Sequence, residues 1–213
     1  MQDLSNFRKS YEKFDLNESD VTDNPLELFR DWFNEAVDHD AVDEANAMSV
    51  STIGLDGFPK TRVVLLKRYS ENGFVFYTNY ESEKGRAIEA NPHVCLSFFW
   101  PGMERQVIIK GTASKLASNL SDGYFESRPK LSQVSAIISP QSQVVPSREY
   151  LESKQKELTE KSGDHLERPK YWGGYIVFPQ SIEFWQGRPN RLHDRIRYEL
   201  NDAYDWVINR LAP

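Results

Sequence analysis

Residues 47–79 read AMSVSTIGLDGFPKTRVVLLKRYSENGFVFYTN, and this stretch carries the clearest structural signal in the chain. Its segments AMSVSTIG, TRVVLLKRY and GFVFYTN are short and rich in β-branched and aromatic residues, as strands are. Asp56-Gly57 and Asn72-Gly73 separate the segments, and such pairs supply the positive φ angles of tight hairpins. The stretch therefore predicts three successive hairpin strands.

Strand and helix patterns alternate on both sides of this stretch. A helix is predicted to open at Asn24-Pro25, where proline suits the first turn, and ESEKGRAIEANP predicts a short helix that stops before Pro92. Further helices are predicted in SNLSDGYFESRP, LSQVSAIIS and the strongly charged SREYLESKQKELTEKSG, and further strands in HVCLSFFW, QVIIKGTASKL, YWGGYIVFP, SIEFWQG, RIRYEL and YDWVINRL. About nine strands with helical insertions predict a mainly β (α+β) fold, and favour a closed or nearly closed antiparallel barrel over an open sheet.

Length and composition limit the classes of function. The 213 residues favour a single domain, residues 24–213, after a polar and mobile leader, residues 1–23. A net charge of -6 argues against nucleic-acid binding. Four histidines without metal spacing and the lone Cys95, expected to be buried in a strand, predict no metal site. The chain shows no signal peptide and no run of about 18 apolar residues that could span a membrane, so we expect a cytoplasmic protein.

Phosphate binding by side chains is suggested at two places. Glycine-rich nucleotide loops and a hydrolase elbow are absent from the sequence, so a bound phosphate would need cationic side chains. Arg62 and Lys67 bracket an apolar run, and Lys84 and Arg86 fall in the first turn of a predicted helix, where cations oppose the helix dipole unless an anion is bound. A solvated basic surface explains Lys84 and Arg86 equally well.

The segment DGYFESRPKLSQ is a more specific candidate. Tyr124 and Arg128 are four residues apart and share a helical face, and Pro129 then begins a turn that leaves Ser132 near the start of the next helix. A phenol, a guanidinium and a hydroxyl that point to one place would bind a phosphate. A capped helix junction with a surface arginine is the simpler explanation from these residues alone.

The segment EFWQGRPNRLHDRIRYEL, residues 183–200, gathers charge beside Trp185. If a strand begins near Arg191, then Arg191, His193 and Arg195 share one face, and Leu192 and Asp194 point to the other. A solvated strand edge remains an alternative. The flat wall of Trp185 favours a site for an anionic aromatic ligand.

The chain resembles the pyridoxine (pyridoxamine) 5'-phosphate oxidase family. The resemblance covers Asn24 to Pro213 and is carried, in order, by RVVLLK, VFYTN, ERQVIIKG, YFESRP, SPQSQ, YWGGY, IEFWQGRPNRLHDR and the terminal RLAP. It implies a homodimeric FMN-binding split β-barrel. It also implies that FMN and O2 oxidise pyridoxamine 5'-phosphate or pyridoxine 5'-phosphate to pyridoxal 5'-phosphate, with release of hydrogen peroxide, and of ammonia from the amine.

The resemblance also assigns residues. The substrate would contact Arg191 and His193 at its ring and reacting carbon, which are the catalytic candidates, and a leader segment containing Arg8 and Tyr11. Its phosphate would bind Lys67, Tyr124, Arg128 and Ser132. FMN would contact Arg62, Val63, Val64, Leu65, Leu66, Lys67, Tyr77, Thr78, Lys84, Gln106, Gln141, Ser142, Trp185 and Arg195.

One residue departs from the family pattern. Family members commonly carry Ser-Arg-Lys where this chain has Ser82-Glu83-Lys84, so an acid replaces a cation that faces the phosphate. Glu83 is therefore given no FMN role, and either Arg86 compensates or FMN affinity is lower. Two alternatives stay open: another split-barrel flavoprotein, such as a flavin reductase or a nicotinamide-dependent oxidoreductase, and a non-catalytic binder of pyridoxal phosphate.

Overall fold

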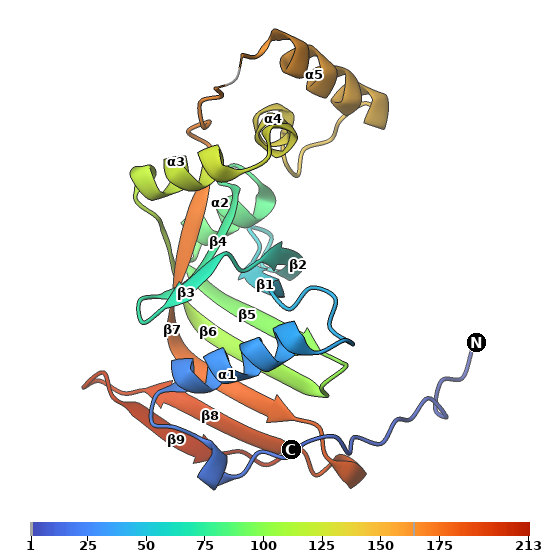
Figure 1. The fold of residues 1–213 in the computed structure, drawn as a ribbon, viewed down its shortest axis with the longest axis vertical. Coiled ribbons are helices and arrows are strands. Elements are labelled where there is room, and N and C mark those ends of the chain that lie inside the picture. The colour runs from blue at the N-terminus through green and yellow to red at the C-terminus, as the bar shows by residue number, and fades with distance from the viewer. Residues whose placement is uncertain (1, 164) are drawn as a thin grey trace. The chain divides into compact units, whose positions relative to one another are not determined.

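Antiparallel strands with helical insertions make up this chain in the computed structural model, which describes residues 2–163 and 165–213 (Figure 1). The strands of this described part are β1 (Ala47–Ile53), β2 (Pro59–Leu65), β3 (Arg68–Ser70), β4 (Gly73–Asn79), β5 (His93–Trp100), β6 (Arg105–Lys115), β7 (Trp172–Gln186), β8 (Asp194–Leu200) and β9 (Trp206–Arg210). The sheet order is β2-β1-β5-β6-β7-β4-β3, and β8 pairs with β7 and with β9. The expected mainly β fold is confirmed.

The helices fall where the sequence predicted them. They are α1 (Pro25–Asp38), α2 (Glu83–Ala90), α3 (Ser118–Ser127), α4 (Lys130–Ile138) and α5 (Arg148–Lys161), with 3-10 turns at Glu18–Asp20 and Pro189–Arg191. The charged helix α5 buries none of its residues, as its composition indicated.

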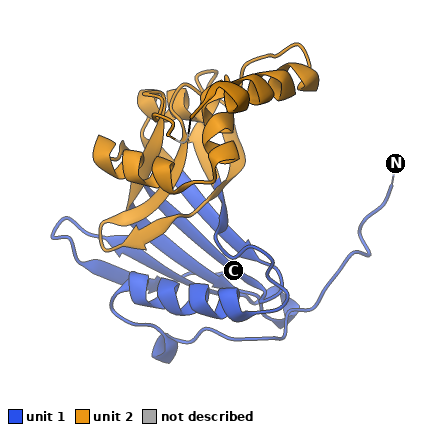
Figure 2. Ribbon diagram, turned by 45° about the horizontal axis from the view of Figure 1, so that its top comes forward, with its two compact units in different colours: residues 1–49, 95–111, 179–213 blue, residues 50–94, 112–178 orange. Residues whose placement is uncertain are grey.

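The chain divides into two compact units (Figure 2). Unit 1 comprises the residues up to 49, residues 95–111 and residues 179–213, and unit 2 comprises residues 50–94 and 112–178. The predicted division into a mobile leader and one domain stays a prediction. Among the described residues, no helix combines the length and the apolar character that crossing a membrane requires.

Two strand boundaries differ from the prediction. The segment TRVVLLKRY is not one strand, because β2 ends at Leu65 and β3 begins at Arg68. Between them the Leu66 side chain is buried and the Lys67 N–H donates to the Val75 carbonyl at 2.8 Å. β1 pairs with β2 and β3 pairs with β4, so both predicted hairpins are present, but the middle predicted strand is divided between them and its two parts lie at opposite ends of the sheet order. The Gly57 and Gly73 turns do have the expected positive φ angles, 80° and 123°.

The second difference is the long strand β7, which joins two segments predicted as separate strands. Its residues up to Val177 pair with β4, and those from Ser181 onward pair with β8. Pro179 lies between these two pairings. A proline has no N–H to donate to a ladder, and its place at the change of partner lets the strand continue.

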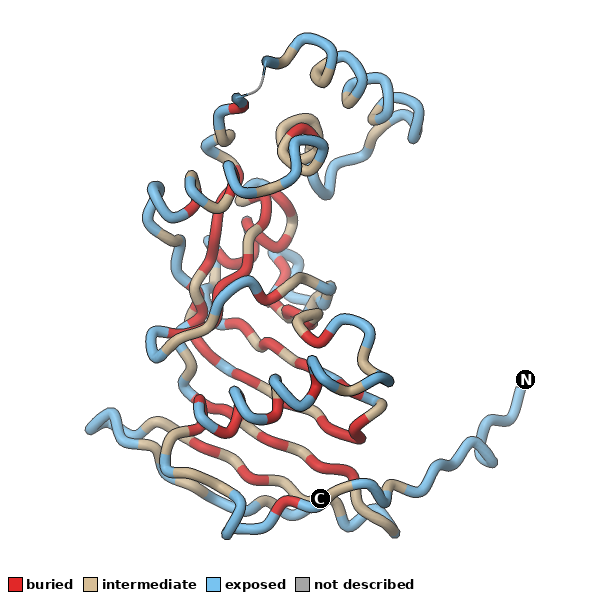
Figure 3. Tube along the Cα trace, in the orientation of Figure 1, coloured by how far each residue is buried: buried red, intermediate tan, exposed pale blue. Residues whose placement is uncertain are grey.

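Helix α1 closes the core of unit 1. The Asn24 side chain accepts a hydrogen bond from the Leu26 N–H at 2.9 Å and caps the helix. Trp32 and Phe29 on the buried face of the helix pack edge-on against Phe184 and Phe98, with ring centroids 5.2 and 5.3 Å apart. Buried and exposed positions alternate along α1 (Figure 3). Burial of these aromatic rings is the main stabilising contribution that the helix makes.

Helices α3 and α4 pack over a separate core in unit 2. Phe125 and Val134 are fully buried there, with Trp172 and Leu166 beside them. Phe125 contacts Trp172 edge-on at 5.4 Å. This cluster fixes the junction between the two helices, which carries the predicted phosphate site. Cys95, in β5 of unit 1, is half-buried, and burial raises the pKa of its thiol.

Candidate functional site

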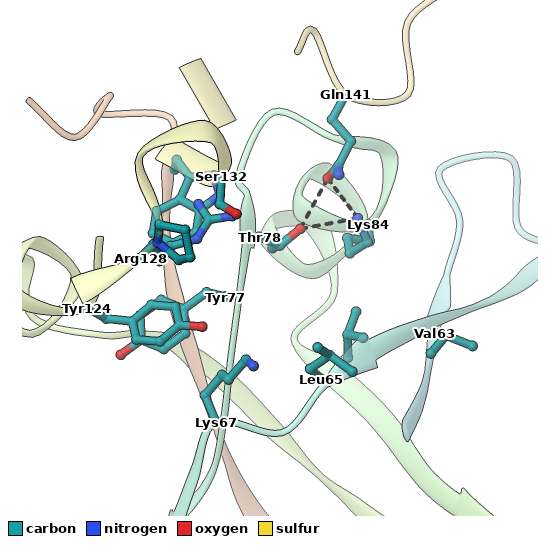
Figure 4. A pocket seen from close by; sticks show the side chains of 13 residues that line it. Val63, Leu65, Lys67, Tyr77, Thr78, Lys84, Tyr124, Arg128, Ser132 and Gln141 are labelled. Atoms are coloured by element: carbon teal, nitrogen blue, oxygen red, sulfur yellow. Dashed lines mark hydrogen bonds between the residues drawn. The ribbon is translucent and has the colours of Figure 1, made fainter. Parts of the chain in front are cut away.

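A cavity of about 460 Å³ opens in unit 2 (Figure 4). This volume is within the usual range for a small-molecule site. Its walls come from β2, β4, α2, α3, α4 and the segments between them, and they are formed by Val63, Val64, Leu65, Lys67, Tyr77, Thr78, Lys84, Tyr124, Arg128, Pro129, Ser132, Gln141 and Trp172. The structure thus brings eleven of the predicted site residues together, all of these except Pro129 and Trp172.

Lys84 supplies a buried ammonium group to this cavity. Its Nζ donates to the Gln141 Oε1 at 2.9 Å and to the Thr78 Oγ1 at 3.1 Å, both of them uncharged acceptors (Figure 4). Burial, with help from the charge of Arg62, lowers the pKa of Lys84 to about 8. An anion in the cavity would restore the stability of the charged form.

Arg128 supplies a second cation, at the C-terminal end of α3. Its Nη1 is buried and has no hydrogen-bond partner within the described residues. The guanidinium lies 4.6 Å from the centre of the Trp172 ring, and burial lowers the pKa of Arg128, which stays charged. A buried donor without a partner is costly, so this group is suited to an anionic oxygen. Arg128 is half-buried rather than fully exposed at the surface.

Aromatic rings line the same side of the cavity. The Tyr77 and Tyr124 rings are stacked with their centroids 3.8 Å apart, and Trp172 is stacked on Tyr77 at 5.7 Å. Tyr124 thereby reaches the cavity beside Arg128, as the helical spacing of the two residues predicted. Trp172 was not among the residues predicted from the sequence, although YWGGY was among the motifs of the resemblance.

Glu83 is neutralised by a cation that the sequence analysis missed. The Glu83 carboxylate forms an ion pair with Lys60 and lies 3.9 Å from Arg62, while Arg86 is exposed. The Lys60 ammonium also contacts Asp56 at 3.0 Å. Lys60 stands two residues before Arg62 on the same strand, and this spacing could have indicated a shared face.

The remaining predicted residues of unit 2 lie outside the cavity lining. The Arg62 Nη1 donates to the Thr52 Oγ1 and to the Lys60 carbonyl, each at 2.8 Å. The Leu66 side chain is buried in the core. Ser142 is exposed and has a φ of 72°.

In unit 1, Trp185 and His193 form an aromatic cluster with Tyr11 of the leader. The Trp185 and His193 rings are 4.7 Å apart, and Tyr11 is 5.8 Å from each. The His193 Nδ1 accepts the Arg188 N–H at 3.0 Å. Burial, followed by the charge of Arg191, lowers the pKa of His193, which favours the neutral ring. Because Nδ1 accepts, the proton of that neutral ring is on Nε2.

The predicted strand face of Arg191, His193 and Arg195 is wrong. Strand β8 begins at Asp194, so His193 precedes it and Arg191 lies in a 3-10 turn with a positive φ of 63°. Asn190 also has a positive φ, and two such residues in succession reverse the chain before the strand can start. The Leu192 side chain is exposed, and Leu192 lies before the start of β8.

Arg195 is the residue of this group that does lie in the strand. It is the register partner of Trp185, and its Nε pairs with the Glu183 Oε1 at 2.8 Å. Asp194 has the structural role expected for it, because its carboxylate pairs with Arg210 at 2.9 Å and with Arg188 at 3.4 Å.

The last two predicted residues are also in unit 1. The Gln106 Nε2 donates to the Ser97 Oγ at 3.1 Å. Arg8 is exposed, and its Nε donates to the Ser5 carbonyl at 3.0 Å.

Comparison with known families assigns the chain. The sequence profile described as pyridoxamine 5'-phosphate oxidase matches residues 35–162, and the profile described as the pyridoxine 5'-phosphate oxidase C-terminal dimerisation region matches residues 172–213. The chain belongs to the pyridoxamine 5'-phosphate oxidase family. The resemblance seen in the sequence is confirmed.

Relatives within the oxidase family match over the full length. A pyridoxine/pyridoxamine 5'-phosphate oxidase from Flavobacterium psychrophilum is 61% identical over 214 residues, which cover 100% of both chains. The protein of the same name from Neisseria gonorrhoeae is 49% identical and covers 99% of this chain and 100% of its own. These names support an oxidoreductase.

Solved structures agree with the oxidase family and its split-barrel fold. PhzG from Burkholderia lata, in complex with tetrahydrophenazine-1-carboxylic acid, has a TM-score of 0.85 at 28% identity and covers 92% of this chain and 95% of its own. An FMN-binding, pyridoxamine 5'-phosphate oxidase-related protein from Nostoc punctiforme has a TM-score of 0.73 at 15% identity, with coverage of 91% and 100%. The latter supports the fold alone.

Proposed function

We propose that this protein uses FMN and O2 to oxidise pyridoxamine 5'-phosphate or pyridoxine 5'-phosphate to pyridoxal 5'-phosphate, with release of hydrogen peroxide, and of ammonia from the amine. The observation that carries the proposal is the unit 2 cavity, which is lined by two cations, the buried Lys84 and the half-buried Arg128, that have no carboxylate partners among the described residues. Two phosphorylated molecules, cofactor and substrate, would satisfy one cation each. The names of the relatives at 61% and 60% identity agree with this chemistry.

FMN fits the donors around Lys84. The ammonium and the hydroxyl of Thr78 can bind an anionic phosphate, and Lys60 prevents Glu83 from repelling it. When bound, FMN supplies the electron acceptor and the reaction with O2. The residues proposed to hold it are Arg62, Val63, Val64, Leu65, Leu66, Lys67, Tyr77, Thr78, Lys84, Gln106, Gln141, Ser142, Trp185 and Arg195.

The substrate phosphate is proposed to bind Lys67, Tyr124, Arg128 and Ser132. Arg128 presents the Nη1 that lacks a partner among the described residues, and its guanidinium lies 4.6 Å from the centre of the Trp172 ring, which is stacked on Tyr77. A fixed phosphate determines where the reacting carbon lies, and such positioning is a large part of catalysis.

His193 is proposed to orient the substrate. With Nδ1 occupied by the Arg188 N–H, the neutral ring offers Nε2–H as a donor to the oxygen or nitrogen substituent of the substrate. A role as proton acceptor would require the ring to exchange its Nδ1 bond first. The geometry therefore favours orientation over base catalysis.

Arg191 and Arg195 contribute positive charge in this proposal. Arg191 is always protonated, so it serves to clamp the substrate rather than to remove a proton. Arg195 is held by Glu183 and by the Ala212 carbonyl at 2.8 Å, which fixes its guanidinium beside Trp185. A fixed cation there would stabilise negative charge that develops on a neighbouring ring.

A homodimer in the cytoplasm completes the proposal. The family profile for residues 172–213 describes a dimerisation region, and this range contains β7, β8 and β9. Trp185 and Arg195 lie on the face of β7 and β8 opposite to the buried Phe184 and Ile196.

Anaerobic flavin reduction tests the proposed function. The purified protein, after incubation with FMN, should be yellow, and pyridoxamine 5'-phosphate and pyridoxine 5'-phosphate should each bleach it when oxygen is absent. The unphosphorylated vitamers are the matched control and should bleach it far more slowly. A flavoprotein bleached only by a reduced nicotinamide nucleotide would indicate another split-barrel oxidoreductase, and a protein that never retains FMN would indicate a pyridoxal phosphate binder.

A further inference from the structure

Glu104 is a buried carboxylate to which the proposed function gives no role. It lies in the turn between β5 and β6 of unit 1, and only 2% of its side chain is exposed. Its φ of 58° is a left-handed backbone conformation, which non-glycine residues adopt at a cost. A buried charge in a strained turn must be stabilised by specific partners.

Those partners all come from the N-terminal leader. The Glu104 Oε2 accepts the backbone N–H of Glu12 at 2.9 Å and that of Lys13 at 3.2 Å. The Lys9 ammonium lies 3.4 Å from the Oε1. Hydrogen bonds to a charged acceptor are stronger than neutral ones, so the leader is held at a defined place on unit 1.

This attachment determines where Tyr11 lies. Tyr11 precedes Glu12, and its ring contacts both Trp185 and His193. A Cβ atom on Gly187 would come within 2.8 Å of the Tyr11 ring, and the Gly187 N–H donates to the Glu104 carbonyl at 2.7 Å. Glu104 therefore makes two kinds of contact. Its side-chain carboxylate binds the leader, and its backbone carbonyl binds Gly187, which lies against the Tyr11 ring.

A second contact from the same turn supports the attachment. Arg105 follows Glu104, and its guanidinium lies 4.6 Å from the centre of the Phe14 ring. The Phe14 carbonyl accepts a hydrogen bond from the Arg188 Nη1 at 3.0 Å. Residues on both sides of Tyr11 are thus tied to unit 1.

We propose that Glu104 is a positioning residue, a latch that holds residues 9–13 so that Tyr11 covers Trp185 and His193. That the covered rings belong to an active site rests on the proposed function, but the latch itself does not. A latched segment differs from the mobile leader that the sequence suggested.

Trypsin digestion of the full chain tests the latch without cofactor or substrate. Cleavage after Lys9 and Lys13 should be slow in the wild type and faster by on the order of tenfold in Glu104→Gln, because a neutral amide binds the N–H groups and Lys9 less well. Mass spectrometry identifies the sites, and cleavage after Arg30 in α1 serves as the internal control for unfolding. Equal rates in wild type and variant would overturn the proposal.

A second variant keeps the test decisive if Glu104→Gln does not fold. Glu12→Pro removes one of the two donated N–H groups from an exposed residue, and Glu12→Ala keeps that N–H. The proline variant should be cleaved several-fold faster than the alanine variant. Identical rates for the two would contradict a latch through this hydrogen bond.

A catalytic readout then separates the latch from the proposed function. In Glu12→Pro, the KM for pyridoxamine 5'-phosphate should rise several-fold relative to Glu12→Ala, while the amount of bound FMN stays unchanged. Faster trypsin cleavage with an unchanged KM would keep the latch but reject its role over the substrate. If the wild-type protein does not oxidise the vitamer, the proposed function fails and the digestion result still stands.

Discussion

At the scale of single residues, four cations of the chain fall into two groups that differ in their partners. Lys60 and Arg195 are paired with the carboxylates of Glu83 and Glu183. Lys84 bonds to uncharged oxygens, and Arg128 keeps one buried nitrogen without a partner in the described chain. Cations of the second group are the ones to which a phosphorylated ligand adds most stability.

Arg128→Ala should weaken substrate binding far more than FMN binding. The variant removes the buried Nη1 that lacks a partner and keeps the donors around Lys84, so we expect the Kd of pyridoxamine 5'-phosphate to rise about a hundredfold, in line with the loss of charge-assisted hydrogen bonds. Titration of the flavin-loaded protein measures this Kd, and flavin fluorescence measures FMN release. Arg128→Lys keeps the positive charge but not the planar guanidinium, so its Kd should lie between those of the wild type and Arg128→Ala. Equal losses of both affinities would argue against a dedicated phosphate site.

Lys84 should make FMN binding depend on pH. The phosphate binds the charged ammonium, whose pKa is about 8 in the free protein, so affinity should fall roughly tenfold per pH unit above that value. Fluorescence titration between pH 7 and 10 checks this, with Lys84→Met as the variant in which the slope disappears. A slope that survives in Lys84→Met would assign the titration to another group.

The same pKa predicts a stability change of opposite sign in the free protein. Burial lowers the pKa of Lys84 from 10.5 to about 8, so between these values the unfolded chain binds more protons than the folded one. Stability should therefore rise with pH through this window, relative to Lys84→Met. Urea unfolding of both proteins at several pH values measures the difference, which should be flat below pH 7.

Arg191→Lys should greatly reduce turnover and leave FMN bound. Arg191 is exposed and lies outside the unit 2 cavity, in a turn with two positive φ angles, and a lysine there would keep the charge but lose the planar fork of the guanidinium. Stopped-flow flavin reduction measures the effect. Reduction at nearly the wild-type rate would show that a positive charge alone is sufficient.

At the scale of elements, the N-terminus of helix α1 is stabilised by its N-cap residue, Asn24. Asn24→Ala removes the acceptor of the Leu26 N–H and should lower the free energy of unfolding by about 1 kcal/mol. Asn24→Asp keeps an acceptor and should cost much less. Urea unfolding of the three proteins gives the comparison, and equal losses in both variants would point to a packing role for the asparagine instead.

The strands show which structural features a local sequence pattern can predict and which it cannot. The Asp56-Gly57 and Asn72-Gly73 turns were predictable, because a positive φ angle is a local property of glycine. The break at Leu66 and the continuation of β7 through Pro179 were not, because each depends on which strand supplies the next hydrogen-bond partner. That choice is made by residues far away in the chain.

At the scale of the whole molecule, the outward face of β8 and β9 is the part suited to a second copy. Arg197 has a buried Nε without a partner in the described chain, and the register places Glu199 opposite the exposed Val207. The dimerisation profile covers all three residues. These features make this face the candidate interface of the proposed homodimer.

Val207→Asp should weaken the proposed homodimer at least tenfold. The new carboxylate stands opposite Glu199, so burial of the face in a dimer would leave like charges together. Analytical ultracentrifugation over a range of concentrations measures the dissociation constant. Val37→Asp, at an exposed position of α1, is the matched control, and similar behaviour of the two variants would place the interface elsewhere.

The sequence by itself determined the helices, most strands and the helical face that joins Tyr124 to Arg128, because these depend on spacing between near neighbours. Only the tertiary structure decided that Lys60 neutralises Glu83, that β8 begins after His193, and that Glu104 binds the backbone of the leader. The physical reason is distance along the chain. Glu104 and Glu12 are 92 residues apart, and a hydrogen bond between them leaves no periodic trace in the sequence.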